Sequence, residues 1–214
     1  MRATYVVRVW IPDRPGALGA VASRIGSVRG DLIGIDILER GAGMAIDELV
    51  VTLPSEDLVT LLVKEIGEVD GVAVEDVHHI AGETLPDPRL AALETAASLV
   101  RQETAGAVLE SFVQRAAEDF SAAWGAVVDR KGRVLASVGE APPAPWIAAF
   151  VTGSRAADAP EGPEDVAWAS LERATLDVVV GRPGRPVRGR ERQQLVALAE
   201  IADVRWAELA ARVP

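Results

Sequence analysis

Cysteine is absent from this chain of 214 residues. Its absence excludes disulfides, thiolate nucleophiles and cysteine-based metal sites. Histidine is scarce, since the only two copies are the neighbours His78 and His79. On a strand their side chains point to opposite faces and cannot bind one metal ion together. No G-x-S-x-G sequence occurs and no Ser-His-Asp set can be assembled. We therefore expect a protein that is not an enzyme and that uses no metal and no cofactor.

Long hydrophobic runs are missing as well. No apolar stretch reaches the roughly 20 residues of a membrane-spanning helix, and the first residues do not resemble a signal peptide. The formal net charge of −10 argues against broad contact with a nucleic-acid backbone. We expect a cytoplasmic protein without nucleic-acid or membrane partners, which leaves small ligands and other proteins.

The composition that remains is that of a folded protein with two domains. Hydrophobic residues make up 49% of the chain and charged residues 25%, which argues against wholesale disorder. Residues 83–89 contain two prolines and show no periodicity, as is typical of a linker. We place the domains at residues 1–82 and 90–214.

The first domain is organised around a strand, a tight corner and a helix start. Alternating apolar residues predict a strand over residues 5–11 that ends at Pro12. Arg14 suits an N-cap and Pro15 the first helical position, so the helix should begin at Gly16. Four residues then follow with the spacing of one apolar helix face: Leu18, Val21, Ala22 and Ile25.

This corner has the chemistry to bind an amino acid. The first N–H groups of a helix, here those of Gly16, Ala17 and Leu18, lack an intrahelical acceptor and attract a carboxylate. Asp13 offers a negative charge for an ammonium group. The alternative is that Asp13 only caps its own helix.

The rest of the first half supplies the other elements of a split βαβ fold. Strand, helix and turn signals place a strand at 31–39, a hairpin turn at 41–43, and then a strand at 44–53, a helix at 55–69 and a strand at 72–80. In the last of these strands we expect Val72, Val74 and Ile80 to share one face. The order βαββαβ predicts a ferredoxin-like antiparallel sheet with both helices on one side. Ile33, Ile35 and Ile37 share a face of the second strand, and we expect a second copy of the chain to cover them.

Residues 4–80 resemble an ACT domain. The resemblance depends on the element order, on the Gly30-Asp31 turn, on Glu39-Arg40 at the end of the second strand, and on the sequence Asp13-Arg14-Pro15-Gly16-Ala17-Leu18. It implies a regulatory domain that binds an amino acid between two copies. It further implies that the ligand lies between Asp13, Arg14, Pro15, Gly16, Ala17 and Leu18 of one copy and Ile33, Gly34 and Ile35 of the other.

The second half reads as helix, hairpin, helix, hairpin, helix. A long helical pattern covers residues 89–120, with Gly106 as a possible break, and hairpins are predicted at 124–137 and 165–181. Residues 142–151 form a short helix at most, residues 155–164 a loop, and an amphipathic helix begins near Gly189. This α-ββ-α-ββ-α order resembles a GAF-like or profilin-like sensor domain. The whole chain is thus predicted to be α+β.

One basic segment stands out in this acidic chain. Residues 182–192 contain five arginines and could bind a phosphate or an acidic partner. The segment lacks the GxxxxGK[ST] pattern of a phosphate-binding loop, and a solvated loop before a helix is the alternative.

Two functions fit these observations. In the first, the chain is a non-enzymatic homodimeric regulator that binds an amino acid or a similar small ligand and relays the bound state to its second domain or to a protein partner. In the second, the ACT-like sheet merely dimerises a scaffold protein that binds no small molecule.

Overall fold

The computed structural model describes residues 2–80, 87–156 and 163–212. The chain divides into two compact units, Met1–Leu85 and Pro86–Pro214, here called unit 1 and unit 2. Residues 83–86 of the predicted linker lie outside the described residues, whereas Pro88 and Arg89 already belong to a helix. In the described parts of the chain, no helix is both long enough and apolar enough to cross a bilayer.

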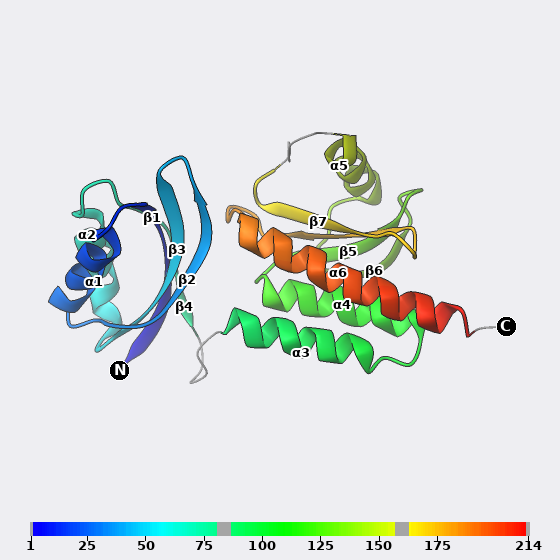
Figure 1. The fold of residues 1–214 in the computed structure, drawn as a ribbon, viewed down its shortest axis with the longest axis horizontal. Helices are drawn as coiled ribbons and strands as arrows, with labels where there is room; N and C mark the ends of the chain where they lie inside the picture. The colour runs from blue at the N-terminus through cyan, green and yellow to red at the C-terminus, as the bar shows by residue number, and fades with distance from the viewer. Residues whose placement is uncertain (1, 81–86, 157–162, 213–214) are drawn as a thin grey trace. The chain divides into compact units, whose positions relative to one another are not determined.

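Unit 1 is a four-stranded antiparallel sheet with its helices on one face (Figure 1). Its elements are β1 (Ala3–Pro12), α1 (Ala17–Ser27), β2 (Asp31–Gly41), β3 (Met44–Leu53), the 3-10 helix η1 (Glu56–Leu58), α2 (Val59–Gly67) and β4 (Ala73–Ile80). The strand order β2-β3-β1-β4 makes β2 an edge strand. This confirms the predicted ferredoxin-like βαββαβ arrangement.

The core of unit 1 lies between the sheet and the two helices. Because side chains alternate along a strand, every second residue of β1 and β3 faces the helices. The central members of this core are Val7, Val9, Val21, Ile25, Leu49, Val51, Leu62 and Ile66, all of them fully buried. The hairpin between β2 and β3 turns on Ala42 and Gly43, whose φ angles of 51° and 77° are the positive values that a type I′ turn requires at both central residues.

A bulge in β4 corrects one prediction. The register between β1 and β4 shifts between Arg8 and Val9, so that Val74 and Val77 both pack against the core. Ile80 pairs with Thr4, which lies on the opposite face of the sheet. The expectation that Val72, Val74 and Ile80 share one face was therefore wrong, because a bulge changes the alternation.

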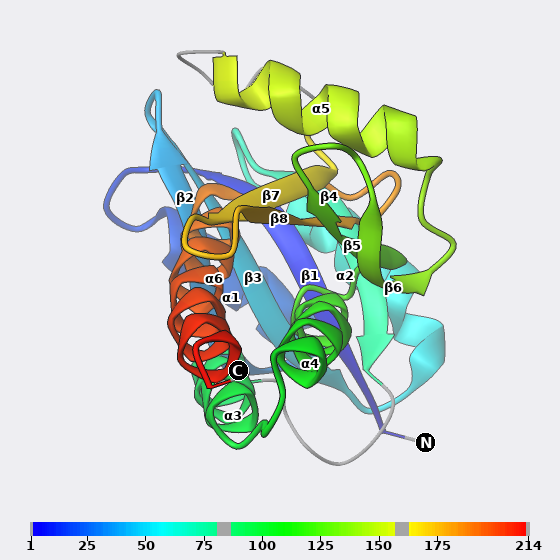
Figure 2. The same ribbon diagram turned by 90° about the vertical axis from the view of Figure 1, so that its right-hand side faces the viewer.

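Unit 2 is a second four-stranded antiparallel sheet with helices on both faces (Figure 2). Its elements are α3 (Pro88–Val100), α4 (Ala105–Asp119), β5 (Trp124–Asp129), β6 (Val134–Gly139), α5 (Ala144–Ala156), β7 (Val166–Leu171), β8 (Leu176–Gly181) and α6 (Gly189–Ala210). The strand order is β6-β5-β8-β7. The predicted succession of helices and hairpins is confirmed.

The two faces of this sheet carry separate cores. One core joins the sheet to α3, α4 and α6 and includes Phe112, Val178 and Leu198. The other joins it to α5 and includes Trp124, Ile147 and Val179. In Figure 2, α5 accordingly lies on the side of the sheet opposite α4 and α6.

Two helix boundaries differ from the predictions. The helical stretch is interrupted at residues 101–104, before Gly106, because Thr104 caps α4 by accepting the N–H of Ala107. Helix α5 extends to Ala156, well beyond the short helix expected, and therefore includes Arg155, which the sequence pattern predicts to lie in a loop. Residues 157–162 of that predicted loop lie outside the described residues.

The basic segment, residues 182–192, is neither a solvated loop nor an exposed phosphate-binding site. Arg182 is buried and donates to the carbonyl oxygens of Phe120, Arg185 and Pro186 and to the Glu191 carboxylate. Arg192 donates to three further carbonyls, those of Glu164, Val166 and Val187. These two arginines bind the chain that joins β8 to α6, which is a structural role.

Candidate functional site

The predicted corner follows directly from the end of β1. Asp13, Arg14, Pro15 and Gly16 are all exposed, Ala17 is buried and Leu18 is half-buried. The N–H of Asp13 donates to the carbonyl of Gly43 over 2.9 Å, which ties the corner to the β2–β3 turn. Arg14 reaches toward Asp70 at 3.7 Å, with both side chains largely exposed.

The helix start is shifted by one residue from the prediction. Helix α1 begins at Ala17, and Gly16 is its N-cap with φ 88°, so Pro15 lies outside the helix and Arg14 is not the cap. This left-handed backbone conformation suits glycine, which has no Cβ to clash. Asp13 makes no cap either, since among the described residues its carboxylate accepts no hydrogen bond from the start of α1.

One of the three expected N–H donors is already occupied. The N–H of Ala17 donates to the carbonyl of Arg14 at 3.3 Å. Arg14 lies outside α1, so this donor has no acceptor within the helix, as predicted, but the turn before the helix already supplies one. The tight turn at residues 14–17 brings that carbonyl back toward the helix. The corner therefore offers fewer free donors to a carboxylate than a bare helix end would.

A buried carboxylate on β3 adds to the site and was not predicted. Asp47 is 4% exposed and pairs in register with Val9 on one side and Ile37 on the other. Its Oδ1 atom has no hydrogen-bond partner among the residues that the structure describes. Burial raises the pKa of Asp47, the positive charge of Arg40 opposes this shift, and the negative charges of Asp13 and Asp36 add to it.

The negative charges of Asp47 and of Asp13 in the corner therefore repel each other. Asp47 lies three residues along β3 from Met44, the partner of Pro12, which corresponds to about 10 Å of strand. A buried carboxylate without a hydrogen-bond partner is costly. A bound ammonium group would relieve that cost and would also reduce the repulsion from Asp13.

The facing-strand residues lie on the exposed edge strand of the same unit. Ile33 and Ile35 are 37% and 47% exposed, and Ile35 pairs with Leu49, so it lies on the helix-covered side of the sheet. Gly34 is half-buried, and a Cβ there would meet Val50 at 3.1 Å. Register shifts beside Ile33 and after Ile37 bend this strand.

The two histidines point to opposite faces of the sheet, as their adjacent positions on a strand predict. His78 pairs with Val6 and His79 with Tyr5, so their side chains lie on opposite faces. His78 Nδ1 lies 3.0 Å from Asp76 Oδ2, and the His79 ring packs edge-on against Tyr5. Over the described ranges, no group of three or more His, Cys, Asp or Glu side chains is placed to hold a metal ion.

Comparison with known proteins gives matches at the level of structure. The ACT domain of GTP pyrophosphokinase from Chlorobium tepidum has 18% identity and a TM-score of 0.31, and the match covers 37% of this chain and 100% of that domain. An ACT domain protein from Streptococcus pneumoniae has 16% identity and a TM-score of 0.31, over 36% and 89% of the two chains. The C-terminal domain of the MgtC protein from Mycobacterium tuberculosis has 23% identity and a TM-score of 0.30, over 39% and 92%.

Several structural neighbours are thus ACT domains, the family that the sequence of unit 1 resembles. The sequence itself matches no protein-family profile and no curated protein. The GAF-like or profilin-like resemblance of residues 90–214 stays a prediction.

Proposed function

We propose that the chain is a non-enzymatic regulator that binds an amino acid at the corner of unit 1, where two copies meet. The observation that carries the proposal is the buried Asp47 carboxylate, which has an unpartnered oxygen and interacts with the corner charge of Asp13. An ammonium group fits this negative environment, and the remaining N–H groups at the start of α1 suit a carboxylate.

The second copy is proposed because of the edge strand. Ile33 and Ile35 expose apolar surface along β2, and an exposed apolar edge strand favours pairing with another strand. Pairing through β2 would cover this surface and would bring Ile33, Gly34 and Ile35 of one copy toward the corner of the other. A ligand bound there would stabilise one arrangement of the dimer over others.

The test is ligand-induced stabilisation. We expect at least one of the twenty amino acids, titrated to millimolar concentration into the full chain, to raise its melting temperature, because a ligand of the folded state stabilises that state. Asp47→Asn should weaken that ligand about ten- to hundred-fold, since it removes a charged hydrogen-bond partner. Glu56→Gln, which removes an exposed carboxylate from η1, is the matched control and should bind like the wild type.

A scaffold function is the second candidate, favoured by the same exposed isoleucines. A stable dimer whose melting temperature responds to none of the twenty amino acids would support the scaffold and contradict the regulator. If the wild type and Asp47→Asn bind that amino acid with equal affinity, the ligand site does not lie at Asp47 of unit 1.

A further inference from the structure

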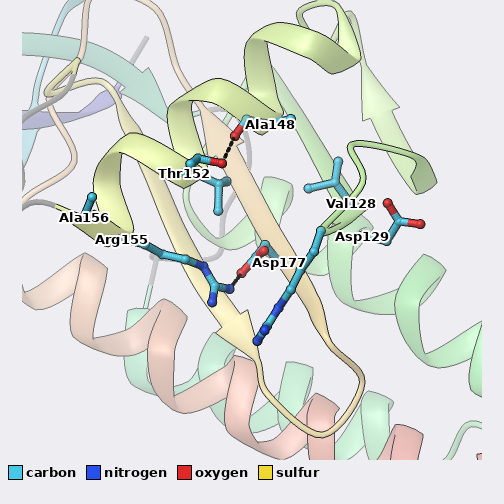
Figure 3. A pocket seen from close by; sticks show the side chains of 9 residues that line it. Val128, Asp129, Ala148, Thr152, Arg155, Ala156 and Asp177 are labelled. Carbon is cyan, nitrogen blue, oxygen red and sulfur yellow. Dashed lines mark hydrogen bonds and ion pairs between the residues drawn. The ribbon is translucent and has the colours of Figure 1, made fainter.

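A cavity of about 360 Å³ opens in unit 2 between α5 and the sheet, at the C-terminal end of that helix (Figure 3). Its apolar wall is made by Val128 of β5 and by Ala148 and Val151 of α5. Its volume is within the range of small-molecule sites, which combine apolar walls with a few polar groups.

The polar group at the base of this cavity is the carboxylate of Asp177. This β8 residue is 2% exposed and lies on the α5-facing side of the sheet, in register with Ser170 and Val128. Arg155 forms an ion pair with its Oδ1 atom, and the Ser170 hydroxyl donates to the same oxygen over 3.1 Å. Among the residues that the structure describes, Oδ2 has no hydrogen-bond partner.

Arg155 reaches Asp177 from the last turn of α5, as Figure 3 shows. Its Nη2 atom donates to Ser170 at 2.8 Å as well as to Asp177, and its guanidinium lies 5.4 Å from the centre of the Trp168 ring. The side chain is 31% exposed. One nitrogen is thus committed to the ion pair, and the other nitrogens of the guanidinium can donate to a ligand.

Arg130 supplies a second cation to the lining. Its Nη2 atom lies 3.2 Å from Glu172, but both side chains are more than half exposed, and such surface pairs are weak. Asp129, beside it, is held in the β5–β6 turn: the N–H groups of Arg133 and Lys131 donate to this carboxylate, and the bond from Arg133 is the main cause of its lowered pKa.

The charges of the cavity select the class of ligand. Because Asp177 and Arg155 already neutralise each other, a ligand with a net charge would leave an unbalanced charge in a partly buried site. A ligand with one positive and one negative group keeps the balance. We propose that unit 2 has its own binding site for a small zwitterion, whose ammonium binds Asp177 Oδ2 and whose carboxylate binds Arg155 and Arg130.

This site does not depend on the site proposed for unit 1, and one experiment distinguishes them. Isothermal titration of the full chain with the twenty amino acids, with acetate and methylammonium as half-ligands, should reveal a binding event that neither half-ligand reproduces. Asp177→Asn should weaken this event about ten- to hundred-fold, because it removes a charged acceptor, while Asp47→Asn leaves it unchanged.

A second variant keeps the test valid if Asp177→Asn fails to fold. Thr152→Leu enlarges an exposed residue that lines the cavity, and it should reduce binding by filling the space. Gly153→Ala is its matched control, since a Cβ at this neighbouring position meets nothing within 4 Å.

The possible results separate the proposals. Binding that is lost in Asp177→Asn or Thr152→Leu and retained in Gly153→Ala supports the unit 2 site. Binding that only Asp47→Asn removes overturns it and leaves unit 1 as the site. Acetate that binds as tightly as any amino acid would show an anion site and overturn the zwitterion, and no binding by any probe overturns both sites.

Discussion

At the scale of the residue, the most informative side chain of unit 1 is the carboxylate at position 47. The alternation Ala45, Asp47, Leu49, Val51 puts a charged residue where the pattern requires an apolar one. Residues that break a local rule in this way are expected at functional sites, where stability is given up for binding.

Asp47→Asn should stabilise the ligand-free protein at neutral pH by about 1 kcal/mol, because it removes a charge that is buried without full hydrogen bonding. The folded-state pKa of Asp47 lies above its ordinary value of 3.8. Between pH 3.8 and the raised pKa of the folded state, Asp47 is protonated more often in the native state than in the unfolded state. Its contribution to the free energy of unfolding therefore falls as pH rises through this window. The variant should therefore be only slightly more stable than the wild type near pH 3.8, and more stable by the full amount of about 1 kcal/mol at neutral pH.

Urea unfolding of both proteins at the two pH values measures this difference. A variant that is less stable than the wild type at neutral pH would contradict the prediction, since it would mean that the charge is stabilised in the folded state.

The residues of the corner could be predicted from the sequence, but their exact roles could not. The exposure of Asp13 to Gly16 follows from a strand that ends at Pro12. The one-residue shift of the helix start and the bond that occupies the Ala17 N–H depend on the positive φ of Gly16. From the sequence, Pro15 suits the first helical position because its fixed φ is compatible with a helix.

At the scale of the element, the start of α1 depends on a glycine that cannot be replaced without strain. Gly16→Ala should destabilise unit 1 by about 1 kcal/mol, because an L-residue in a left-handed conformation is disfavoured by that order. Gly19→Ala, in the first turn of the same helix, should instead stabilise it by roughly 0.5 kcal/mol, since alanine favours helix and a Cβ there meets nothing within 4 Å.

Denaturant unfolding of the two variants, with the wild type beside them, checks the opposite signs. Equal stability of Gly16→Ala and Gly19→Ala would mean that the corner relaxes to another backbone conformation.

The elements themselves were largely predictable because their periodicity is strong. The alternation of β1 and the apolar faces of α1 and α2 place them correctly. Helix α5 was underestimated because Pro143 and Pro145 open it and Gly153 interrupts its pattern. The cavity that it forms with β5 and β8 could not be predicted, since it brings together residues that are distant in the sequence.

At the scale of the whole molecule, the proposed dimer is the property most open to test. Ile35→Lys should shift the chain from dimer toward monomer, because it puts a charge on the edge strand, and lysine on edge strands opposes pairing. Its effect on the stability of the single chain should be small, since Ile35 is 47% exposed.

Light scattering of the variant at several concentrations measures the shift. Leu61→Lys is the matched control, because Leu61 is a 42% exposed apolar residue on α2, and it should leave the dimer intact. Dissociation by Leu61→Lys alone would place the contact on the helices instead of β2.

Because side chains alternate along β8, this strand contacts both the cavity and the helical core of unit 2. Asp177 faces the cavity, while its two covalent neighbours, Leu176 and Val178, are buried in the core shared with α4 and α6. A ligand that displaces the Asp177 backbone would therefore also displace Leu176 and Val178 in that core. The cavity and the helical core of unit 2 are therefore separated at this strand by a single peptide bond on either side of Asp177.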